Sequence, residues 1–435
     1  MARRKIHLLA YLKTGPTANH AGGWRHPEST LHDILDPRRY EHIAQVLEAA
    51  CFDGCFFADL QGLYDIHRGS FATYIEKGGQ ISFLDPMMVL PLMARVTRHL
   101  GLGATLSTTF IPAFTIARQL ASLDIISGGR VAWNVVTSAT DLEARNFGLE
   151  KIPSRDERYA LAEEVVEACL ALWDCWDEDV FILDKESGRF GDAAKVRYAN
   201  YRGSRISTRG PLPSPRSPQG HPVIMQAGAS PRGRDFAARF AELIFAPSGA
   251  EPELAAFTQD MRARLAAAGR SPDDCLIMPQ MRVVVGETDA QAQDKAALLE
   301  SLIDPDLALA NNSSYLGADL SGAKDFDTLT RAQGNQGIQG VADHLRARME
   351  REKLDLTQAA SKIDVELVGS PKTIADKMQA MFESGICDGF VISPTYFPGS
   401  IEAFCRAVVP ELQRRGLFRT HYEASTLRGT IRDDL

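Results

Sequence analysis

The chain has 435 residues, of which 45% are hydrophobic and 24% are charged, a composition typical of ordinary water-soluble globular proteins. A net charge of -8 provides no basic surface for nucleic acid or for an anionic membrane. No run of about 18 apolar residues occurs, and no apolar signal segment follows the basic residues near the start. We therefore expect a cytoplasmic protein.

The metal-binding and disulfide-forming residue types show no organised spacing. Seven cysteines are scattered along the chain without a CxxC pair, and the ten histidines include no HExxH pattern. Neither a disulfide framework nor a zinc site is favoured by such spacing. We expect no metal.

Strand-like and helix-like segments alternate along most of the chain. Helical spacing of apolar residues occurs at 38–50, 87–99, 114–126, 155–173, 231–240, 252–268 and 289–301. Between them, strands are expected at Lys5–Leu12, Gly54–Ala58, Leu100–Leu106, Arg130–Val136, Pro222–Gln226, Leu243–Ala246, Leu276–Val285 and Gly389–Ser393. Alternation implies a parallel sheet, and eight units imply a closed (β/α)8, or TIM, barrel of the α/β class. A doubly wound open sheet is the less favoured alternative, because no GxGxxG motif follows a strand.

Two long stretches interrupt the alternation. Residues 175–220 are rich in Gly, Pro, Ser and Arg, and residues 302–364 are polar with a helical stretch near 344–353. We treat residues 1–435 as a single domain in which both stretches are insertions over the carboxyl-terminal face of the barrel. Loops of this length are typical of lids or binding elements, and disordered decoration is the alternative.

The most informative segment is SLDIISGGRVAWNVVTS, residues 122–138, which reads as a helix, a glycine turn and a buried strand. Asn134, Thr137 and Ser138 fall at or just after the carboxyl end of that strand, where α/β barrels place their ligand chemistry. Polar residues are common in barrel loops, so an ordinary loop is the competing interpretation.

Polar side chains also end two other expected strands. Asp59 follows GCFFA, and a carboxylate there could position a ligand or act as a base, or could form a loop ion pair. Thr105 and Ser107 share one face of their strand. Inward-facing hydroxyls suit a flavin or a polar substrate, although they could equally fill the barrel interior.

The sequence QAGASPRG is the best candidate for an anion site. A strand runs into a turn of small residues and then into a helix with Pro231 at its first position, so free backbone N–H groups and Ser230 would face a phosphate. A helix cap without a ligand is the alternative. In RDERY, Arg155 could contact a phosphate and Tyr159 could reach back over the mouth, or the segment could be an ordinary charged first turn.

Aromatic and imidazole groups follow the first two strands. The loop NHAGGWRHPES contains His20 and Trp24, and Tyr64 follows Asp59. Such groups in loops on the expected active face indicate a pocket, and these three are our candidates for catalytic or substrate-side residues.

Taken together, the segments resemble the bacterial-luciferase-like superfamily, and within it the flavin-dependent monooxygenases of the nitrilotriacetate and dibenzothiophene-sulfone group. The matching segments run in order from about residue 6 to residue 430. They are WRHPES, FFAD, GLGATLSTT, SLDIISGGRVAWNVVTS, NFG followed by DERY, QAGASPRG, and the blocks VGSPKTIAD, DGF and VVPELQRRGLFR.

The resemblance implies a TIM barrel that binds reduced FMN at its carboxyl face. By position, Asp59 and Thr105 match flavin contacts of the family, Asn134 lies where the isoalloxazine ring is expected, and Tyr159 and Ser230 match positions near the ribityl phosphate. One departure is Arg155, which stands where the family usually has the His of HDERY. An arginine can hold a phosphate but cannot act as a neutral base. The stretch GGQISFLDP, residues 78–86, is also unusual for the group and lies near the expected substrate pocket.

The activity implied is that of a two-component monooxygenase. A separate NAD(P)H:flavin reductase would supply reduced FMN, and the chain would use it with O2 to oxygenate a small organic substrate, by C–N or C–S cleavage or by ring oxygenation. A homodimer or homotetramer is what the resemblance suggests. Two alternatives stay open: a deazaflavin-dependent oxidoreductase that transfers hydride, and a flavin-binding protein without catalysis.

Overall fold

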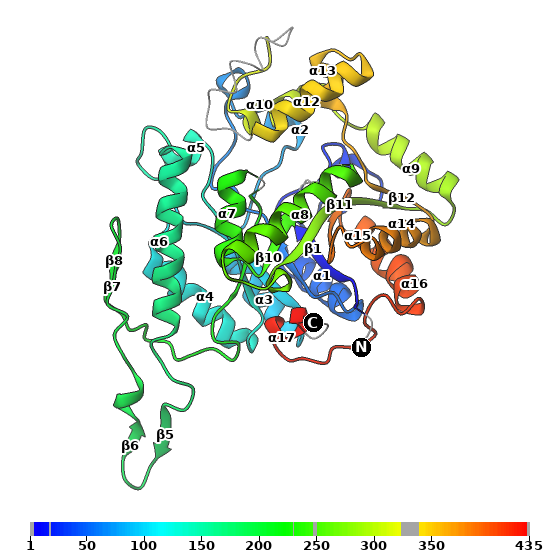
Figure 1. The fold of residues 1–435 in the computed structure, drawn as a ribbon. Coiled ribbons are helices and arrows are strands. Elements are labelled where there is room, and N and C mark those ends of the chain that lie inside the picture. Colours follow the sequence, from blue (N-terminus) through cyan, green and yellow to red (C-terminus); the bar gives the residue numbers. More distant parts are fainter. Residues whose placement is uncertain (1–3, 17–18, 229, 247–249, 323–338, 433–435) are drawn as a thin grey trace.

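Eight parallel strands close into a barrel in the computed structural model, which describes residues 4–432 apart from 17–18, 229, 247–249 and 323–338 (Figure 1). Neighbouring strands pair in chain order, and the last one returns to pair with the first. The barrel strands are β1 (His7–Leu12), β2 (Gly54–Phe57), β3 (Gly101–Ser107), β4 (Val131–Val136), β9 (Val223–Gln226), β10 (Leu243–Ala246), β11 (Leu276–Val285) and β13 (Gly389–Pro394). The TIM-barrel prediction is confirmed, and each expected strand is present.

Helices surround the barrel on its outer side. Leu8, Ala10 and Leu12 of β1 belong to the outer core beneath them, whereas Leu9 lies in the barrel interior, as the two-residue period of a strand requires. The outer helices are α1 (Pro37–Ala49), α3 (Pro86–Val96), α4 (Ala113–Ser127), α6 (Arg155–Trp173), α7 (Pro231–Phe240), α8 (Glu251–Ala267), α9 (Asp289–Ser301), α14 (Pro371–Glu383), α15 (Gly399–Ala403) and α16 (Val409–Arg414).

Local sequence signals set the ends of the helices that border the site. Helix α4 ends at Gly128, which has φ 75°, a conformation that glycine adopts without a steric cost. Helix α6 begins with a capping box, in which the hydroxyl of Ser154 and the carboxylate of Glu157 each bond the other residue's backbone N–H. These signals start β4 and α6 at the positions that the sequence predicts.

The prediction that both insertions lie over the carboxyl-terminal face is wrong for residues 175–220, because this stretch connects the end of α6 to the start of β9 and so begins and ends at the amino-terminal end of the barrel (Figure 1). There Gln219 Oε1 accepts the backbone N–H of Arg428 in α17 (Leu427–Arg432) at 3.2 Å. Residues 175–220 carry two short hairpins, β5–β6 (Phe181–Asp184, Arg189–Gly191) and β7–β8 (Tyr201–Arg202, Ser207–Thr208), and the first hairpin projects well away from the barrel. Residues 302–364 form α10 (Pro305–Leu316), α12 (Gln339–Glu352) and α13 (Leu356–Ser361), with 323–338 outside the described residues. Short β12 (Leu367–Gly369) then extends the sheet beside β11.

Small elements also follow the early strands. Helix α2 (Ala72–Lys77) lies in the loop after β2, and α5 (Asp141–Asn146) lies in the loop after β4. Helix α10 packs against α2 and α13, so the two loop regions meet above the barrel. The interpretation of residues 1–435 as one domain stays a prediction.

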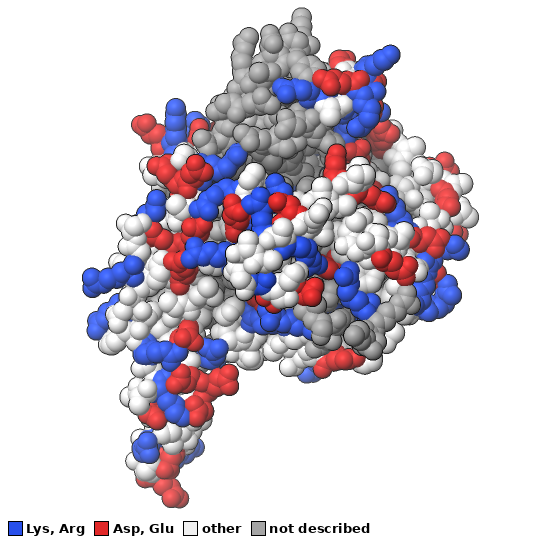
Figure 2. All heavy atoms as spheres, viewed as in Figure 1, with Lys and Arg blue, Asp and Glu red and all other residues white. Residues whose placement is uncertain are grey.

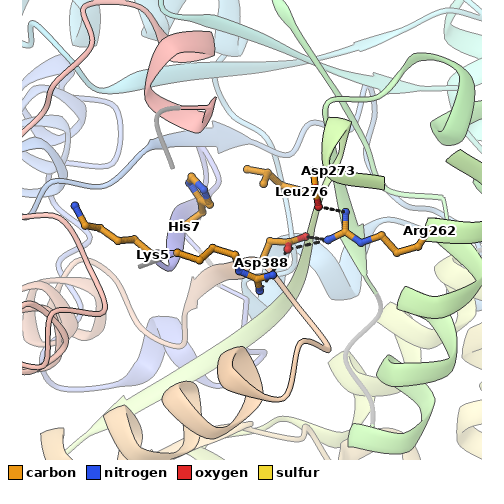
Figure 3. A pocket seen from close by; sticks show the side chains of 7 residues that line it. Lys5, His7, Arg262, Asp273, Leu276 and Asp388 are labelled. Atoms are coloured by element: carbon orange, nitrogen blue, oxygen red, sulfur yellow. Dashed lines mark hydrogen bonds and ion pairs between the residues drawn. The ribbon is translucent and has the colours of Figure 1, made fainter. Parts of the chain in front are cut away.

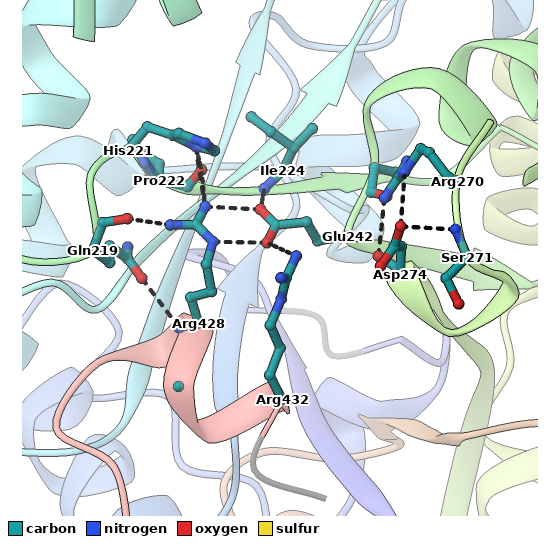
Figure 4. A network of polar contacts seen from close by, with 12 residues as sticks. Gln219, His221, Pro222, Ile224, Glu242, Arg270, Ser271, Asp274, Arg428 and Arg432 are labelled. Carbon is teal, nitrogen blue, oxygen red and sulfur yellow. Dashed lines mark hydrogen bonds and ion pairs between the residues drawn. The ribbon is translucent and has the colours of Figure 1, made fainter. Parts of the chain in front are cut away.

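A C-terminal helix, α17 (Leu427–Arg432), covers the amino-terminal end of the barrel. Its residues Leu427 and Ile431 belong to the same buried cluster as the interior side chains of the strands. Arg428 forms two 2.8 Å contacts with the carboxylate of Glu242, the residue before β10, and Arg432 approaches the same carboxylate at 3.1 Å (Figure 4). The chain therefore uses its last helix to close the face opposite the expected site.

A second feature of the amino-terminal face is a small hollow lined by Lys5, His7 and an ion pair (Figure 3). Arg262 binds both carboxylate oxygens of Asp388 at 2.8 and 2.7 Å. The hollow has a volume of about 20 Å³, which is room for about one water molecule and not for an organic ligand.

The surface shows no large region of one charge on the face drawn in Figure 2, where acidic and basic side chains are interspersed. In the part of the chain that the structure describes, no helix is long and apolar enough to cross a membrane.

Candidate active site

A cavity of about 330 Å³ opens at the carboxyl-terminal end of the barrel. Its walls come from the ends of β2, β4 and β9, from the start of α6 and α7, and from α10. The lining residues are Asp59, Leu60, Tyr64, Val135, Val136, Thr137, Ser138, Ala139, Thr140, Glu143, Tyr159, Gln226, Ala227, Gly228, Phe236, Ser314 and Tyr315. This is the face where the sequence predicts the site, and its size suits a small organic ligand.

Thr105 and Asn134 pair beside each other on β3 and β4. The side-chain amide of Asn134 donates to Thr105 Oγ1 at 2.9 Å, and that hydroxyl donates to the carbonyl of Phe57 at 2.6 Å. Both side chains are about 95% buried, and neither is among the lining residues, although Val135, next to Asn134 on β4, is one of them. Asn134 Oδ1 has no hydrogen-bond partner among the described groups. A buried amide oxygen without a partner is costly, so this atom is suited to accept a hydrogen bond from a ligand.

Asp59 reaches the cavity from the end of β2 as a half-buried carboxyl group. Burial raises its pKa to about 6, a hydrogen bond with Ser82 opposes this rise, and the nearby carboxylates of Asp85 and Glu143 add to it. The group therefore accepts hydrogen bonds as a carboxylate at neutral pH and gains a proton that it can donate as pH falls toward 6.

The turn between β9 and α7 forms a close-packed cradle. Ser230 is the N-cap of α7, and its hydroxyl accepts the N–H of Gly233 at 3.1 Å, which satisfies the cap interpretation. A Cβ atom placed on Gly228 or on Gly233 would lie 2.8 Å from the hydroxyl of Tyr159. A larger residue at Gly228 would have to displace the Gln226 and Tyr159 side chains, so the glycines let the turn pack directly against that hydroxyl. The N–H groups of Gly228 and Gly233 are bonded to Gln226 Oε1 at 2.7 Å and to Ser230 Oγ at 3.1 Å.

The two arginines at the start of α6 have different surroundings. Arg158, which the sequence analysis did not single out, is 3% exposed, and its guanidinium donates to the carbonyls of Pro153 and Ser138. It holds the loop after β4 in place. Arg155, predicted as a phosphate contact, is half-buried on the outer turn and is not among the lining residues.

The loop after β4 is fixed by a buried carboxylate that the sequence analysis also missed. Ser138, at φ 52°, donates to Glu143 at 3.0 Å, and the hydroxyl of Thr140 donates to the same carboxylate at 2.9 Å. Glu143 is 6% exposed and lines the cavity. The signal in the sequence was the Thr140–Glu143 spacing, which is that of a helix N-cap.

Of the three substrate-side candidates, one lines the cavity. Tyr64 stands there with Tyr315 of α10, the two ring centroids being 6.4 Å apart. His20 is 2% exposed in the loop after β1, and burial, with Arg282 and His26 nearby, lowers its pKa to about 4. Trp24 donates its indole N–H to the carbonyl of Lys77 at 2.9 Å and is not a lining residue.

Among the described residues, no group of three or more His, Cys, Asp or Glu side chains is placed to hold a metal ion. The cavity is lined by carboxyl, amide and hydroxyl groups together with Ala227 and Gly228 of the turn before α7. Such a combination suits a ligand with a planar polar ring at one end and an anionic group at the other.

Residues 16–388 match the family described as luciferase-like monooxygenase. The chain belongs to this family. The resemblance seen in the sequence is confirmed, and the chain is a luciferase-like monooxygenase, a family whose members depend on flavin.

Similar proteins of this family cover the chain almost completely. Dibenzothiophene-sulfone monooxygenase of Rhodococcus erythropolis (strain XP) is 41% identical, over 98% of this chain and 96% of the relative. Nitrilotriacetate monooxygenase component A of Aminobacter aminovorans is 38% identical, over 94% and 92%. The crystal structure of long-chain alkane monooxygenase superposes with a TM-score of 0.88 at 35% identity, covering 99% of this chain and 96% of that one.

Proposed function

We propose that this luciferase-like monooxygenase binds reduced FMN in the cavity and uses it with O2 to oxygenate a small organic substrate. The observation that carries the proposal is the buried Asn134 Oδ1, which lacks a partner next to Thr105, in the same mouth as the Gly228 cradle. An oxygen acceptor for a ring N–H and a tightly packed polar turn that can receive a phosphate are what a flavin mononucleotide requires.

Different residues of the chain would bind the ring and the phosphate of the flavin. Asn134, Thr105 and Asp59 would hold the polar edge of the isoalloxazine ring. Tyr159, Gly228 and Ser230 would hold the phosphate, with Arg155 as a further contact. The chemistry that the flavin supplies when bound is the reduction of O2, and the protein contributes orientation and a site shielded from water.

Helix α10 supplies the shield in this proposal. Its residues Ser314 and Tyr315 line the cavity from above, and Asp304 and Asp306 at its start bind Lys77 at 3.0 Å and Arg68 at 2.8 Å in the loop after β2. We propose that the 302–364 insertion acts as the lid of the site.

We further propose that a separate NAD(P)H:flavin reductase delivers the reduced flavin. The sequence has no GxGxxG motif after a strand, and the similar nitrilotriacetate enzyme is named as one component of a larger system. A homodimer or homotetramer stays a prediction.

The experiment compares the chain with and without a reductase. The chain alone, mixed with FMN, NADH and O2, should not consume NADH, and addition of a flavin reductase should start consumption. Photochemically reduced FMN, bound to the chain before O2 is admitted, should support oxygenation of a substrate without the reductase and without NADH. NADH oxidation by the chain alone would contradict the two-component proposal.

A further inference from the structure

A lysine follows the first barrel strand at the mouth of the barrel. Leu8, Ala10 and Leu12 of β1 face the outer helices, so the two-residue period puts Tyr11 and Lys13 on the inner side. The ammonium group of Lys13 lies 5.7 Å from the centroid of the Tyr11 ring. The chain thus carries a cation at the carboxyl end of β1, above the apolar barrel interior.

The hydrogen-bond partner of this lysine is neutral. Lys13 Nζ donates to Gln80 Oε1, and the same oxygen accepts the hydroxyl of Tyr315 at 3.0 Å. Within the described ranges of the chain, Lys13 has no ion pair with a carboxylate. Burial lowers the pKa of Lys13 to about 7, since the charged form loses water without gaining a counter-charge.

A second cation near this mouth provides a contrast. Arg282 of β11 forms an ion pair with Glu366 at 2.9 Å and donates to the carbonyl of Asp364 at 2.6 Å, so its charge is balanced within the protein. Among the described residues, Lys13 has the Gln80 amide oxygen and the Tyr11 ring as neighbours and no carboxylate. A buried ammonium group of this kind is stabilised by an anion brought by a ligand.

The lysine cluster is connected to the cavity and separated from the proposed phosphate site. Tyr315, which shares Gln80 with Lys13, lines the cavity beside Tyr64. Strand β1 stands four strands from β9 in either direction around the barrel, so Lys13 lies across the mouth from the Gly228 turn. A flavin phosphate held at that turn leaves the Lys13 side of the mouth to the substrate.

We propose that Lys13, with Gln80 and Tyr315, binds an oxyanion group, a carboxylate or a sulfonate, on the organic substrate. This inference rests on the proposed function, because it assigns the opposite side of the cavity to the flavin. It gives this chain a preference for acidic substrates over neutral molecules of the same shape. Gln80 belongs to GGQISFLDP, the stretch that departs from the pattern of the similar enzymes.

The test measures binding of matched acid and amide probes to the full chain by isothermal titration calorimetry. The probes are biphenyl-4-carboxylate with biphenyl-4-carboxamide, and benzenesulfonate with benzenesulfonamide. The wild-type chain should bind each acid more tightly than its amide by about 10- to 100-fold, the range expected of a buried charge-assisted hydrogen bond. Lys13→Met should abolish this preference by weakening only the acids, and Lys13→Arg should restore most of it.

The control is Lys372→Met, which removes a lysine on the outer helix α14 whose ammonium is already paired with Asp376 at 2.7 Å. It should leave the acid preference unchanged. Absence of an acid preference in the wild type, or equal weakening of acid and amide in a folded Lys13→Met variant, would overturn the inference.

Binding of FMN to the same variants separates the two proposals. Wild-type protein that binds FMN but shows no acid preference would refute only the role of Lys13. Failure of the wild type to bind FMN or reduced FMN would refute the proposed function itself. A loss of FMN affinity in Lys13→Met, with the acid preference intact, would assign the lysine to the flavin and overturn the inference.

Discussion

The surroundings of Asp59 at the cavity disfavour its ionised form, so ionisation of this group in the folded protein costs folding free energy. Its pKa is raised from 3.8 to about 6, first by burial and then by the carboxylates of Asp85 and Glu143. The folded protein therefore holds the Asp59 proton more tightly than the unfolded chain does. Stability from this group is present at low pH and is lost as pH rises from about 4 to about 6.

We expect Asp59→Asn to stabilise the protein at pH 8 by about 2 kcal/mol, because it removes the cost of a buried carboxylate. The gain should shrink as pH falls below about 6 and should vanish near pH 4. Urea denaturation at a series of pH values measures it. Asp294→Asn, at an exposed position of α9, is the control and should show no such pH-dependent gain. A gain that is equal at pH 8 and pH 4 would contradict the account.

The sequence indicated which residues lie at strand ends, but it did not indicate the hydrogen-bond partners of their side chains. Asp59 and Tyr159 line the cavity, and both could be singled out because strand ends and helix starts can be recognised from local patterns, whereas their role in binding stays a prediction. His20 and Trp24 came from the right loop, yet both are engaged by the protein away from the lining. The Lys13 cluster joins distant parts of the chain: Gln80 lies 67 positions after Lys13, and Tyr315 lies 235 positions after Gln80. No local sequence pattern could therefore reveal it.

At the scale of an element, the β9–α7 turn is the part of the site that depends most directly on glycine. A Cβ on Gly228 would contact the Gln226 amide and lie 2.8 Å from the Tyr159 hydroxyl. It would also lie 3.1 Å from the Cα atom of Gly233 in the first turn of α7. An added side chain at Gly228 should therefore change the shape of the proposed ligand site without displacing the turn from the barrel.

Gly228→Ala should weaken FMN binding by more than about tenfold, because it fills the proposed phosphate cradle. The free energy of unfolding should change by less than about 1 kcal/mol, since the Gln226 and Tyr159 side chains can shift toward the cavity. Equilibrium dialysis and urea denaturation measure the two quantities. Gly322→Ala, where an added Cβ meets no described atom within 4 Å, should alter neither. Unchanged FMN affinity in Gly228→Ala would argue against the cradle.

Helix α10 shows why the insertions were harder to predict than the barrel. Its sequence PDLALANNSSYL mixes apolar residues with the polar run 311–314, and Ser313 and Ser314 satisfy their hydroxyls by bonding backbone carbonyls four residues earlier. Asp304 caps its start and Gly317 ends it. Those caps were visible in the sequence, but the apolar residues do not gather on one helical face, and packing against α2 and α13 is a tertiary effect.

At the scale of the whole molecule, the candidate site lies at one end of the barrel and a stabilising helix lies at the other. The carboxyl end carries the cavity, whereas the amino end is closed by α17 through Leu427, Ile431 and the Glu242–Arg428 pair (Figure 4). Glu242 is 7% exposed. A change at this end should therefore alter stability without altering the site.

Glu242→Ala should lower the free energy of unfolding by about 3 kcal/mol, because Arg428 keeps its partly buried charge but loses its carboxylate partner. FMN affinity of the folded variant should stay at the wild-type value. Denaturation with urea and flavin titration at low temperature measure both. Glu287→Ala, at an exposed loop position, serves as the control for removal of a glutamate. A stable Glu242→Ala variant would show that α17 does not brace the barrel.

The central claim is that the cavity holds reduced FMN for reaction with O2. Stopped-flow absorbance, with anaerobic protein and photoreduced FMN mixed against oxygenated buffer, tests it directly. We expect the time course of flavin reoxidation to differ from that of free reduced FMN when the protein is in excess, and to approach it in Gly228→Ala. A wild-type time course identical to that of free flavin, under conditions where binding has been demonstrated, would contradict the account.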